Sequence, residues 1–146
     1  TVGSWKNGLL AIKTFLHDSV GIDTNTFSLS DGSGLSRYNY TSPNHFISAL
    51  SWAYNNKNIR NKFLDTFPRG GLDGTLENRL ENIDSTTTIL AKTGSLSGVS
   101  CLSGYIISKT NSPLAFSILI NGFVNSSLPY RNIQDEIVYS LSKIKL

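Results

Sequence analysis

Three strand-like runs separated by short connections constrain the fold of this chain more than any other sequence feature. They cover residues 86–92, 100–108 and 114–120 and are rich in Thr, Ile, Leu and aromatic residues. The connections, residues 94–98 and 109–113, are short and contain Gly or Pro, as in antiparallel hairpins. The last run is almost entirely apolar, so we expect it to be covered on both faces. The pattern predicts a three-stranded antiparallel meander.

Amphipathic patterns on either side of these runs predict helices. Ser4 is placed to cap a first helix, and Ser42 followed by Pro43 is a typical start of a second. The apolar stripe of the first helix is Trp5, Leu9, Ile12, Leu16 and Val20. A C-terminal helix has the stripe Tyr130, Ile133, Ile137, Leu141 and Ile144. The fold class is therefore α+β, a small antiparallel sheet flanked by helices.

Length and composition limit the alternatives. A chain of 146 residues fits one domain and leaves little room for a second, so we expect no second domain in these residues. Hydrophobic residues make up 39% and charged residues 16%, which excludes a disordered tail or a coiled coil. The net charge of +3 is spread over scattered basic residues, with residues 57–62 the densest group. Binding to nucleic acid is therefore not expected.

Several site types are also not expected. Cys101 is the only cysteine, so no intrachain disulfide can form. His17 has no recognisable partners for a metal site, and no apolar run approaches the length of a membrane span. Because the chain begins with Thr1 instead of Met, we expect a processed or truncated piece of a longer protein.

The end of the first strand run carries the most suggestive chemistry. Lys92 supplies a fixed positive charge, Thr93 a hydroxyl, and Gly94 space for another backbone to approach. Together they suit capture of an anionic peptide end by charge-assisted hydrogen bonds and strand addition. The alternative is a hairpin edge with a solvated lysine, since edge strands often carry Lys.

Three ordered segments favour the first interpretation. They are residues 31–37 (DGSGLSR), residues 72–76 (LDGTL) followed by Arg79, and residues 91–99 (AKTGSLSGV). In this order they resemble the C-terminal part of the D-alanyl-D-alanine carboxypeptidase/endopeptidase family of the penicillin-binding protein 4 type, peptidase family S13. We also expect Thr75 to cap a short helix that reaches Leu80.

The resemblance implies a fold, a set of site residues and a setting. The fold is the C-terminal portion of a serine β-lactamase/penicillin-binding-protein transpeptidase-like domain. Catalytic roles are implied for Lys92, Thr93 and Ser95, the last through a backbone N–H that forms half of an oxyanion hole. Substrate-binding roles are implied for Gly94, Arg37, Thr75 and Ser97. The implied ligands are peptidoglycan stem peptides and β-lactams, without a cofactor or metal, in the periplasm or outside the cell.

Two other elements of the family, a Ser-x-x-Lys nucleophile pair and a Ser-x-Asn element, are not found at matching positions. Residues 140–143 and 142–145 read as Ser-x-x-Lys but follow the Lys-Thr-Gly stretch, which is the wrong order. Residues 42–44 read as Ser-x-Asn but look like a helix cap, and residues 130–132 (YRN) are equally misplaced. We expect these patterns to be chance matches, and the chain alone to be inactive.

Two further hypotheses remain open. A non-catalytic binding or interaction module could use the same strand edge to hold a peptide carboxylate. A β-lactamase or esterase relative would share the Lys-Thr-Gly strand, although residues 31–37 and 73–75 argue against it.

Overall fold

A computed structural model describes residues 3–109 and 112–144. The elements, in chain order, are α1 (Trp5–Asp18), α2 (Pro43–Asn55), α3 (Arg60–Leu64), the 3₁₀ turn η1 (Gly74–Leu76), β1 (Thr87–Leu96), β2 (Val99–Ser108), β3 (Leu114–Asn121) and α4 (Leu128–Ser142). The predicted α+β class is confirmed by this arrangement.

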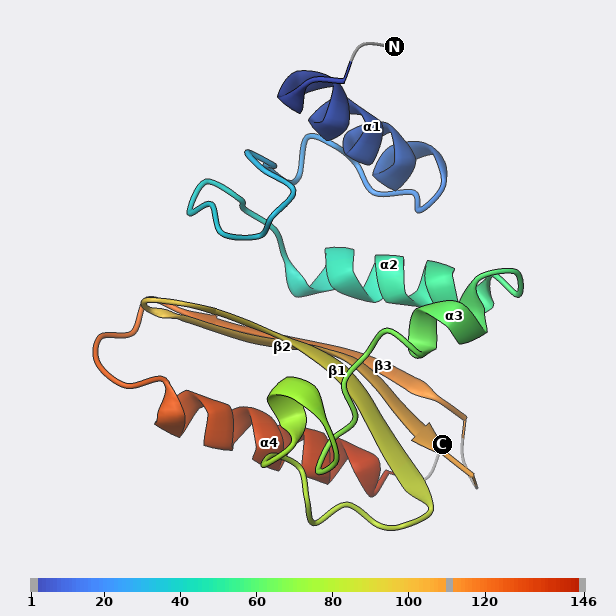
Figure 1. Ribbon diagram of the computed structural model, residues 1–146, viewed down its shortest axis with the longest axis vertical. Coiled ribbons are helices and arrows are strands. Elements are labelled where there is room, and N and C mark those ends of the chain that lie inside the picture. Colours follow the sequence, from blue (N-terminus) through green and yellow to red (C-terminus); the bar gives the residue numbers. More distant parts are fainter. Residues whose placement is uncertain (1–2, 110–111, 145–146) are drawn as a thin grey trace.

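The strands form one antiparallel sheet in the order β1-β2-β3, as predicted (Figure 1). The predicted end of the first strand is wrong. β1 continues to Leu96, which pairs with Val99, so the connection is only Ser97 and Gly98. Gly98 has φ of +74°, a left-handed backbone conformation that favours glycine at the second position of this turn. The Lys-Thr-Gly stretch therefore lies inside a strand. The other predicted turn, 109–113, includes residues 110 and 111, which lie outside the described part.

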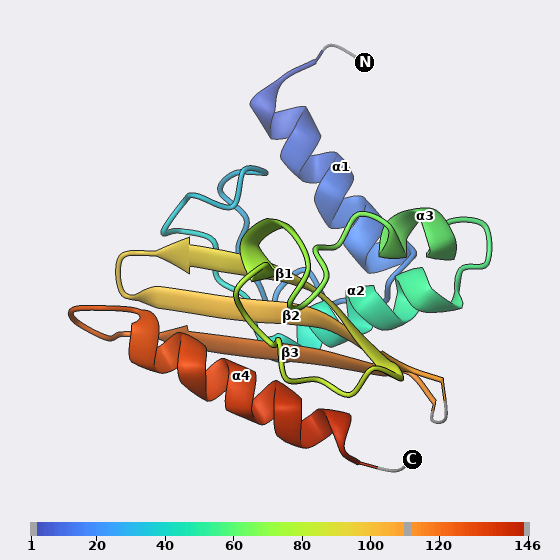
Figure 2. The ribbon, with the colours of Figure 1, turned by 60° about the horizontal axis from the view of Figure 1, so that its bottom comes forward.

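Helices cover both faces of the sheet, with α4 on one face and α2 with α3 on the other (Figures 1 and 2). The main core lies between the sheet and α4 and includes Ile89, Leu102, Phe116 and Val138. On the opposite face the Tyr105 hydroxyl donates to the Leu50 carbonyl oxygen at 2.7 Å, which joins β2 to α2.

The first helix starts where the sequence predicts, with the Ser4 hydroxyl accepting from the Asn7 N–H at 3.1 Å. Its predicted stripe does not form a core, because no described residue of α1 is buried. Trp5 is 69% exposed, and its indole N–H donates to the Ser30 carbonyl oxygen at 2.9 Å. α1 contacts α2 through the edge-to-face rings of Phe15 and Trp52. The helix thus forms an outer layer (Figure 1).

The C-terminal helix is confirmed, but its predicted apolar stripe is only partly the buried face: Leu141 packs against the core. Ile133 and Ile137 are exposed, whereas Gln134 and Val138 are fully buried. The buried face is turned by about one residue, roughly 100°. The reason is the Gln134 amide, which donates to the Ser100 carbonyl oxygen at 2.9 Å and satisfies a polar side chain in the interior.

The expectation that Thr75 caps a helix reaching Leu80 is wrong. The helical turn is η1, only Gly74–Leu76, and its N-cap is Asp73. The Asp73 carboxylate accepts from both the Arg69 N–H and its guanidinium, each at 2.7 Å. After η1 the Leu76 and Arg79 carbonyl oxygens accept from the Gly71 N–H at 3.0 and 2.7 Å, and Leu80 has φ of +62°, so the backbone leaves the helical conformation before Leu80.

Candidate functional site

The end of β1 holds the Lys-Thr-Gly stretch with alternating orientations. Ile89 and Ala91 belong to the core on the α4 face. Because side chains alternate along a strand, Thr93 and Ser95 share that face, whereas Lys92 and Gly94 face the α2 side. A regular strand therefore sets the orientation of each side chain in this stretch.

The outer edge of β1 is covered only in part. The Ala91 N–H donates to the Pro68 carbonyl oxygen at 3.1 Å, and the Gly70 N–H donates to the Ile89 carbonyl oxygen at 2.9 Å. Alternate residues of an antiparallel edge strand point their backbone groups outward. The backbone N–H groups of Thr93 and Ser95 therefore point to the same side, and no described segment pairs with the edge there. This part of the edge can accept an added peptide strand.

The charge of Lys92 is available at this open edge. Its side chain is exposed, and its ammonium donates to the Thr93 carbonyl oxygen at 2.7 Å. Lys92 is in none of the ion pairs found among the described residues. An ammonium bonded to a neutral carbonyl can exchange that bond for a stronger one to a carboxylate.

Arg37 reaches the turn that follows this stretch. Its guanidinium donates to the Ser97 carbonyl oxygen at 3.1 Å, across 60 positions in the sequence. The loop that carries Arg37 is organised by Asp31 and Asn39, whose side chains are bonded at 2.8 Å. Hydrogen bonds from Asn39, and further bonds from Ser33 and the following backbone, hold the pKa of the Asp31 carboxyl below its usual value.

A cavity of about 700 Å³ lies between this loop and the end of the sheet. It is lined by Arg37, Gly94, Ser95 and Cys101, among others. Burial raises the pKa of the Cys101 thiol, which disfavours the reactive thiolate form.

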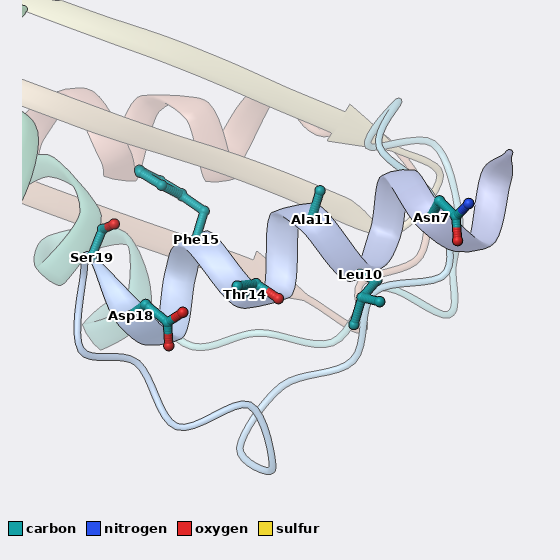
Figure 3. Close-up of a pocket in the computed structure, with 7 residues that line it drawn as sticks. All are labelled: Asn7, Leu10, Ala11, Thr14, Phe15, Asp18 and Ser19. Carbon is teal, nitrogen blue, oxygen red and sulfur yellow. The ribbon is translucent and has the colours of Figure 1, made fainter. Parts of the chain in front are cut away.

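A shallower groove of about 480 Å³ runs along α1 between Asn7 and Ser19 (Figure 3). None of the residues predicted for the site lines it. No group of acidic, His or Cys side chains suited to a metal ion occurs in the described ranges. Within those ranges, no helix is both long and apolar enough to cross a bilayer.

All the predicted site residues gather around this end of the sheet. Gly94, Ser95 and Arg37 line the cavity. The Thr93 hydroxyl donates to the Thr75 hydroxyl at 3.0 Å, so these two are in direct contact. Ser97 contributes its carbonyl oxygen to Arg37.

The misplaced Ser-x-x-Lys pattern at residues 140–143 lies at the other end of the sheet. α4 begins beside the β1–β2 turn and runs away from it (Figure 2). The Lys143 ammonium lies over the Tyr139 ring, 3.9 Å from its centroid. In the overlapping pattern 142–145, Ser142 donates to the Tyr139 carbonyl oxygen at 2.7 Å, and Lys145 lies outside the described residues.

The sequence reasoning missed one cluster behind the site. Arg79, quoted above only as part of a motif, pairs with Asp135 of α4 at 2.7 Å and also donates to Gln134. Gln134 lies outside the apolar stripe predicted for this helix, so no pattern in the sequence pointed to the cluster. The partners are 55 and 56 positions apart, which no local pattern reveals.

Known proteins resemble this chain over almost all of its length. The profile of the "D-Ala-D-Ala carboxypeptidase 3 (S13) family" matches residues 1–144. D-alanyl-D-alanine carboxypeptidase DacB of Haemophilus influenzae is 36% identical over 127 residues, covering 86% of this chain and 26% of that protein. D-alanyl-D-alanine carboxypeptidase of Actinomadura sp. is 34% identical over 146 residues, covering 97% of this chain and 26% of that protein.

The fold has solved counterparts. The crystal structure of penicillin binding protein 4 from Haemophilus influenzae superposes with a TM-score of 0.83 at 32% identity, covering 97% of this chain and 33% of that one. The same protein complexed with a β-lactam gives a TM-score of 0.80. The chain spans about a quarter of the length of the curated relatives, 26% of each. The family match over residues 1–144 places this chain in the D-Ala-D-Ala carboxypeptidase 3 (S13) family.

Proposed function

We propose that residues 1–146 are the C-terminal part of a penicillin-recognising domain, without a second domain, in a serine-type D-alanyl-D-alanine carboxypeptidase/endopeptidase. The observation that carries this proposal is the open edge of β1 at Thr93 and Ser95, beside the unpaired charge of Lys92. The relatives named D-alanyl-D-alanine carboxypeptidases support the reaction class. The proposed location is the periplasm or the cell exterior, where peptidoglycan lies.

The strand supplies substrate binding in this proposal. A stem peptide ending in D-Ala-D-Ala, or a β-lactam, lies along the outer edge of β1 by strand addition. Lys92 exchanges its bond to the Thr93 carbonyl oxygen for the substrate carboxylate, and the Thr93 hydroxyl donates to the same carboxylate. Gly94 leaves room for the ligand backbone.

The same edge supplies transition-state stabilisation. The outward N–H of Ser95 donates to the carbonyl oxygen as negative charge develops on it, as half of an oxyanion hole. The nucleophilic serine and its activating lysine come from the rest of the protein, outside these 146 residues. Arg37 and Ser97, bonded to each other at the far end of the strand, bind the more distant part of the peptide.

Labelling with a fluorescent penicillin, followed by intact mass, tests the proposal. We expect a covalent adduct on the full-length protein and none on the 146-residue chain. An adduct on Ser140 or Ser142 of the short chain would contradict the assignment of the nucleophile. No adduct on the full-length protein, together with binding of a D-Ala-D-Ala peptide at Lys92–Ser95, would favour the alternative, a non-catalytic binding module.

Substitution of Lys92 tests the assigned role of the strand. In the full-length protein, Lys92→Ala should slow acylation by penicillin by about a hundredfold, since a hydrogen bond to a charged group contributes about 1.5–3 kcal/mol. Lys109→Ala, an exposed lysine at the end of the sheet away from the site, is the matched control. Equal rates for the two variants would exclude Lys92 from carboxylate binding.

A further inference from the structure

The hydrogen bond between the Thr93 and Thr75 hydroxyls uses the one proton that Thr93 could donate to a substrate. The Thr93 hydroxyl donates to the Thr75 hydroxyl at 3.0 Å. A hydroxyl has one proton to donate and two lone pairs that accept. Thr93 therefore cannot donate to Thr75 and to a substrate carboxylate at the same time. One of the two hydroxyls must rotate when a carboxylate arrives.

We propose that Thr75 is a positioning residue: with a carboxylate bound, its hydroxyl donates to Thr93 Oγ1, which directs the single Thr93 proton to the carboxylate. This inference rests on the function proposed above. The Thr75 side chain is exposed and touches the strand through the Thr93 hydroxyl, so it can rotate without disturbing the core. A second hydroxyl that only donates keeps its neighbour oriented, and such preorganised donors contribute most at a site of developing charge.

The chain around Thr75 is held in place from both sides. We call residues 68–80 the clamp segment. At its start, the Pro68 carbonyl oxygen and the Gly70 N–H bond to β1 at Ala91 and Ile89. In its middle, Leu76, the residue after Thr75, is fully buried in the core. Thr75 is therefore carried on a backbone that is paired to the strand it serves.

The other end of the clamp segment is tied to α4. The Arg79 guanidinium donates to Asp135 with Nη2 at 2.7 Å and with Nε at 3.1 Å, and to Gln134 at 3.2 Å. The Arg79 and Asp135 side chains are only 12% and 25% exposed, so the pair is poorly screened by solvent. A bidentate ion pair of this kind fixes the orientation of the guanidinium as well as its distance from the carboxylate. The clamp segment thus holds Thr75 beside Thr93 without help from a ligand.

The geometry distinguishes positioning from direct contact with the substrate. If Thr75 acts only through Thr93, removing its hydroxyl has an effect only while the Thr93 hydroxyl is present. If Thr75 touches the substrate itself, the two losses are independent. A double-mutant cycle separates these cases.

The experiment measures the rate of acylation by penicillin in the full-length protein for Thr75→Val, Thr75→Ser, Thr93→Val and the double variant Thr75→Val/Thr93→Val. Thr88→Val, another exposed threonine on β1, is the control for the same substitution elsewhere. We expect Thr75→Val to slow acylation by about tenfold, the effect of one hydrogen bond of about 1.4 kcal/mol. Thr75→Ser, which keeps the hydroxyl, should acylate at the rate of the unsubstituted protein. The melting temperatures of the Thr75 variants should equal that of the unsubstituted protein.

Each other outcome decides against the proposal in a recognisable way. A rate for Thr75→Val equal to that of Thr88→Val overturns the positioning role. A further tenfold loss on adding Thr75→Val to Thr93→Val assigns Thr75 to the substrate and also overturns it. Loss of rate in Thr75→Ser together with a lowered melting temperature shows a merely structural role. Absence of acylation in the unsubstituted protein contradicts the proposed function itself and is distinguishable from all three.

Discussion

Two segments border the site, and each is connected to the rest of the molecule by an arginine of its own. The two arginines bind very different partners. The loop of residues 30–39 ends in the exposed Arg37, which donates to a neutral carbonyl oxygen at the β1–β2 turn. The clamp segment carries Arg79, whose side chain is mostly buried and pairs with the carboxylate of Asp135. A guanidinium that bonds to a neutral carbonyl oxygen can still bind an anionic ligand. A guanidinium that is paired with a carboxylate stabilises the fold instead. The loop of residues 30–39 therefore forms the adaptable side of the site, and the clamp segment forms the fixed side.

The largest expected difference concerns the leucines of the two segments. Leu76 of the clamp segment is fully buried, and Leu35 of the loop is 69% exposed. Leu76→Ala should lower the free energy of unfolding by about 3 kcal/mol, through lost burial and the cavity that remains. Leu35→Ala should change it by less than about 0.5 kcal/mol. Equilibrium unfolding in urea measures both, and equal effects would remove the distinction between the segments.

The ion pair of the clamp segment should give the next largest effect. Arg79→Ala leaves Asp135 and Gln134 without their donor, at a cost of about 2 kcal/mol, below that of a fully buried pair because Asp135 retains some solvent. Arg131→Ala is the matched control, because the exposed Arg131 guanidinium of α4 bonds to the Ser127 hydroxyl and its loss should cost less than about 0.5 kcal/mol. The Arg131 carbonyl oxygen, which accepts from the Arg79 guanidinium at 3.3 Å, is retained in this variant. A loss for Arg131→Ala as large as for Arg79→Ala, measured in urea, would contradict this account.

Low pH should lower the stability of both segments, because protonation of Asp31 in the loop and of Asp73 in the clamp segment weakens their hydrogen bonds. The pKa of Asp31 is lowered, first by its bond from Asn39, and that of Asp73 by its bonds from Arg69. A carboxyl whose folded pKa lies below its unfolded value contributes stability above the unfolded pKa and loses it as the pH falls through the folded pKa. Stability should therefore decline below about pH 4, near the ordinary carboxyl pKa. In Asp31→Asn the decline should be shallower; an unchanged slope in unfolding curves taken from pH 5 to pH 2 would argue against this role.

The smallest expected effect on stability belongs to Arg37. Its side chain is exposed and its one bond goes to a backbone carbonyl oxygen. Arg37→Ala should change the free energy of unfolding by less than about 0.5 kcal/mol, while weakening binding of peptides whose distal part carries a carboxylate. Unfolding in urea and KM for such peptides test the two statements separately. A loss of stability like that of Arg79→Ala would make the two segments alike.

Local patterns in the sequence located most elements of the fold. Ser4 marked the start of α1, and Ser42 with Pro43 marked the start of α2. The three strands were expected in the observed order and pairing. These features are determined by residues near one another in the chain, where capping and alternation act. The end of β1 was missed because Gly94 looked like a turn residue, although only Ser97 and Gly98 form the turn.

What the sequence by itself determined was the order of the three strands and of helices α1, α2 and α4, and the position of the Lys-Thr-Gly stretch at the end of the first strand run. The tertiary structure alone decided which face of α4 is buried, because the Gln134 amide finds its partner on β2, 34 positions away. It also decided that Pro68 covers β1 only as far as Ala91, and that Thr75 meets the Thr93 hydroxyl. These contacts join residues distant in sequence, and their free energy depends on a geometry that exists only after the sheet and α4 have packed.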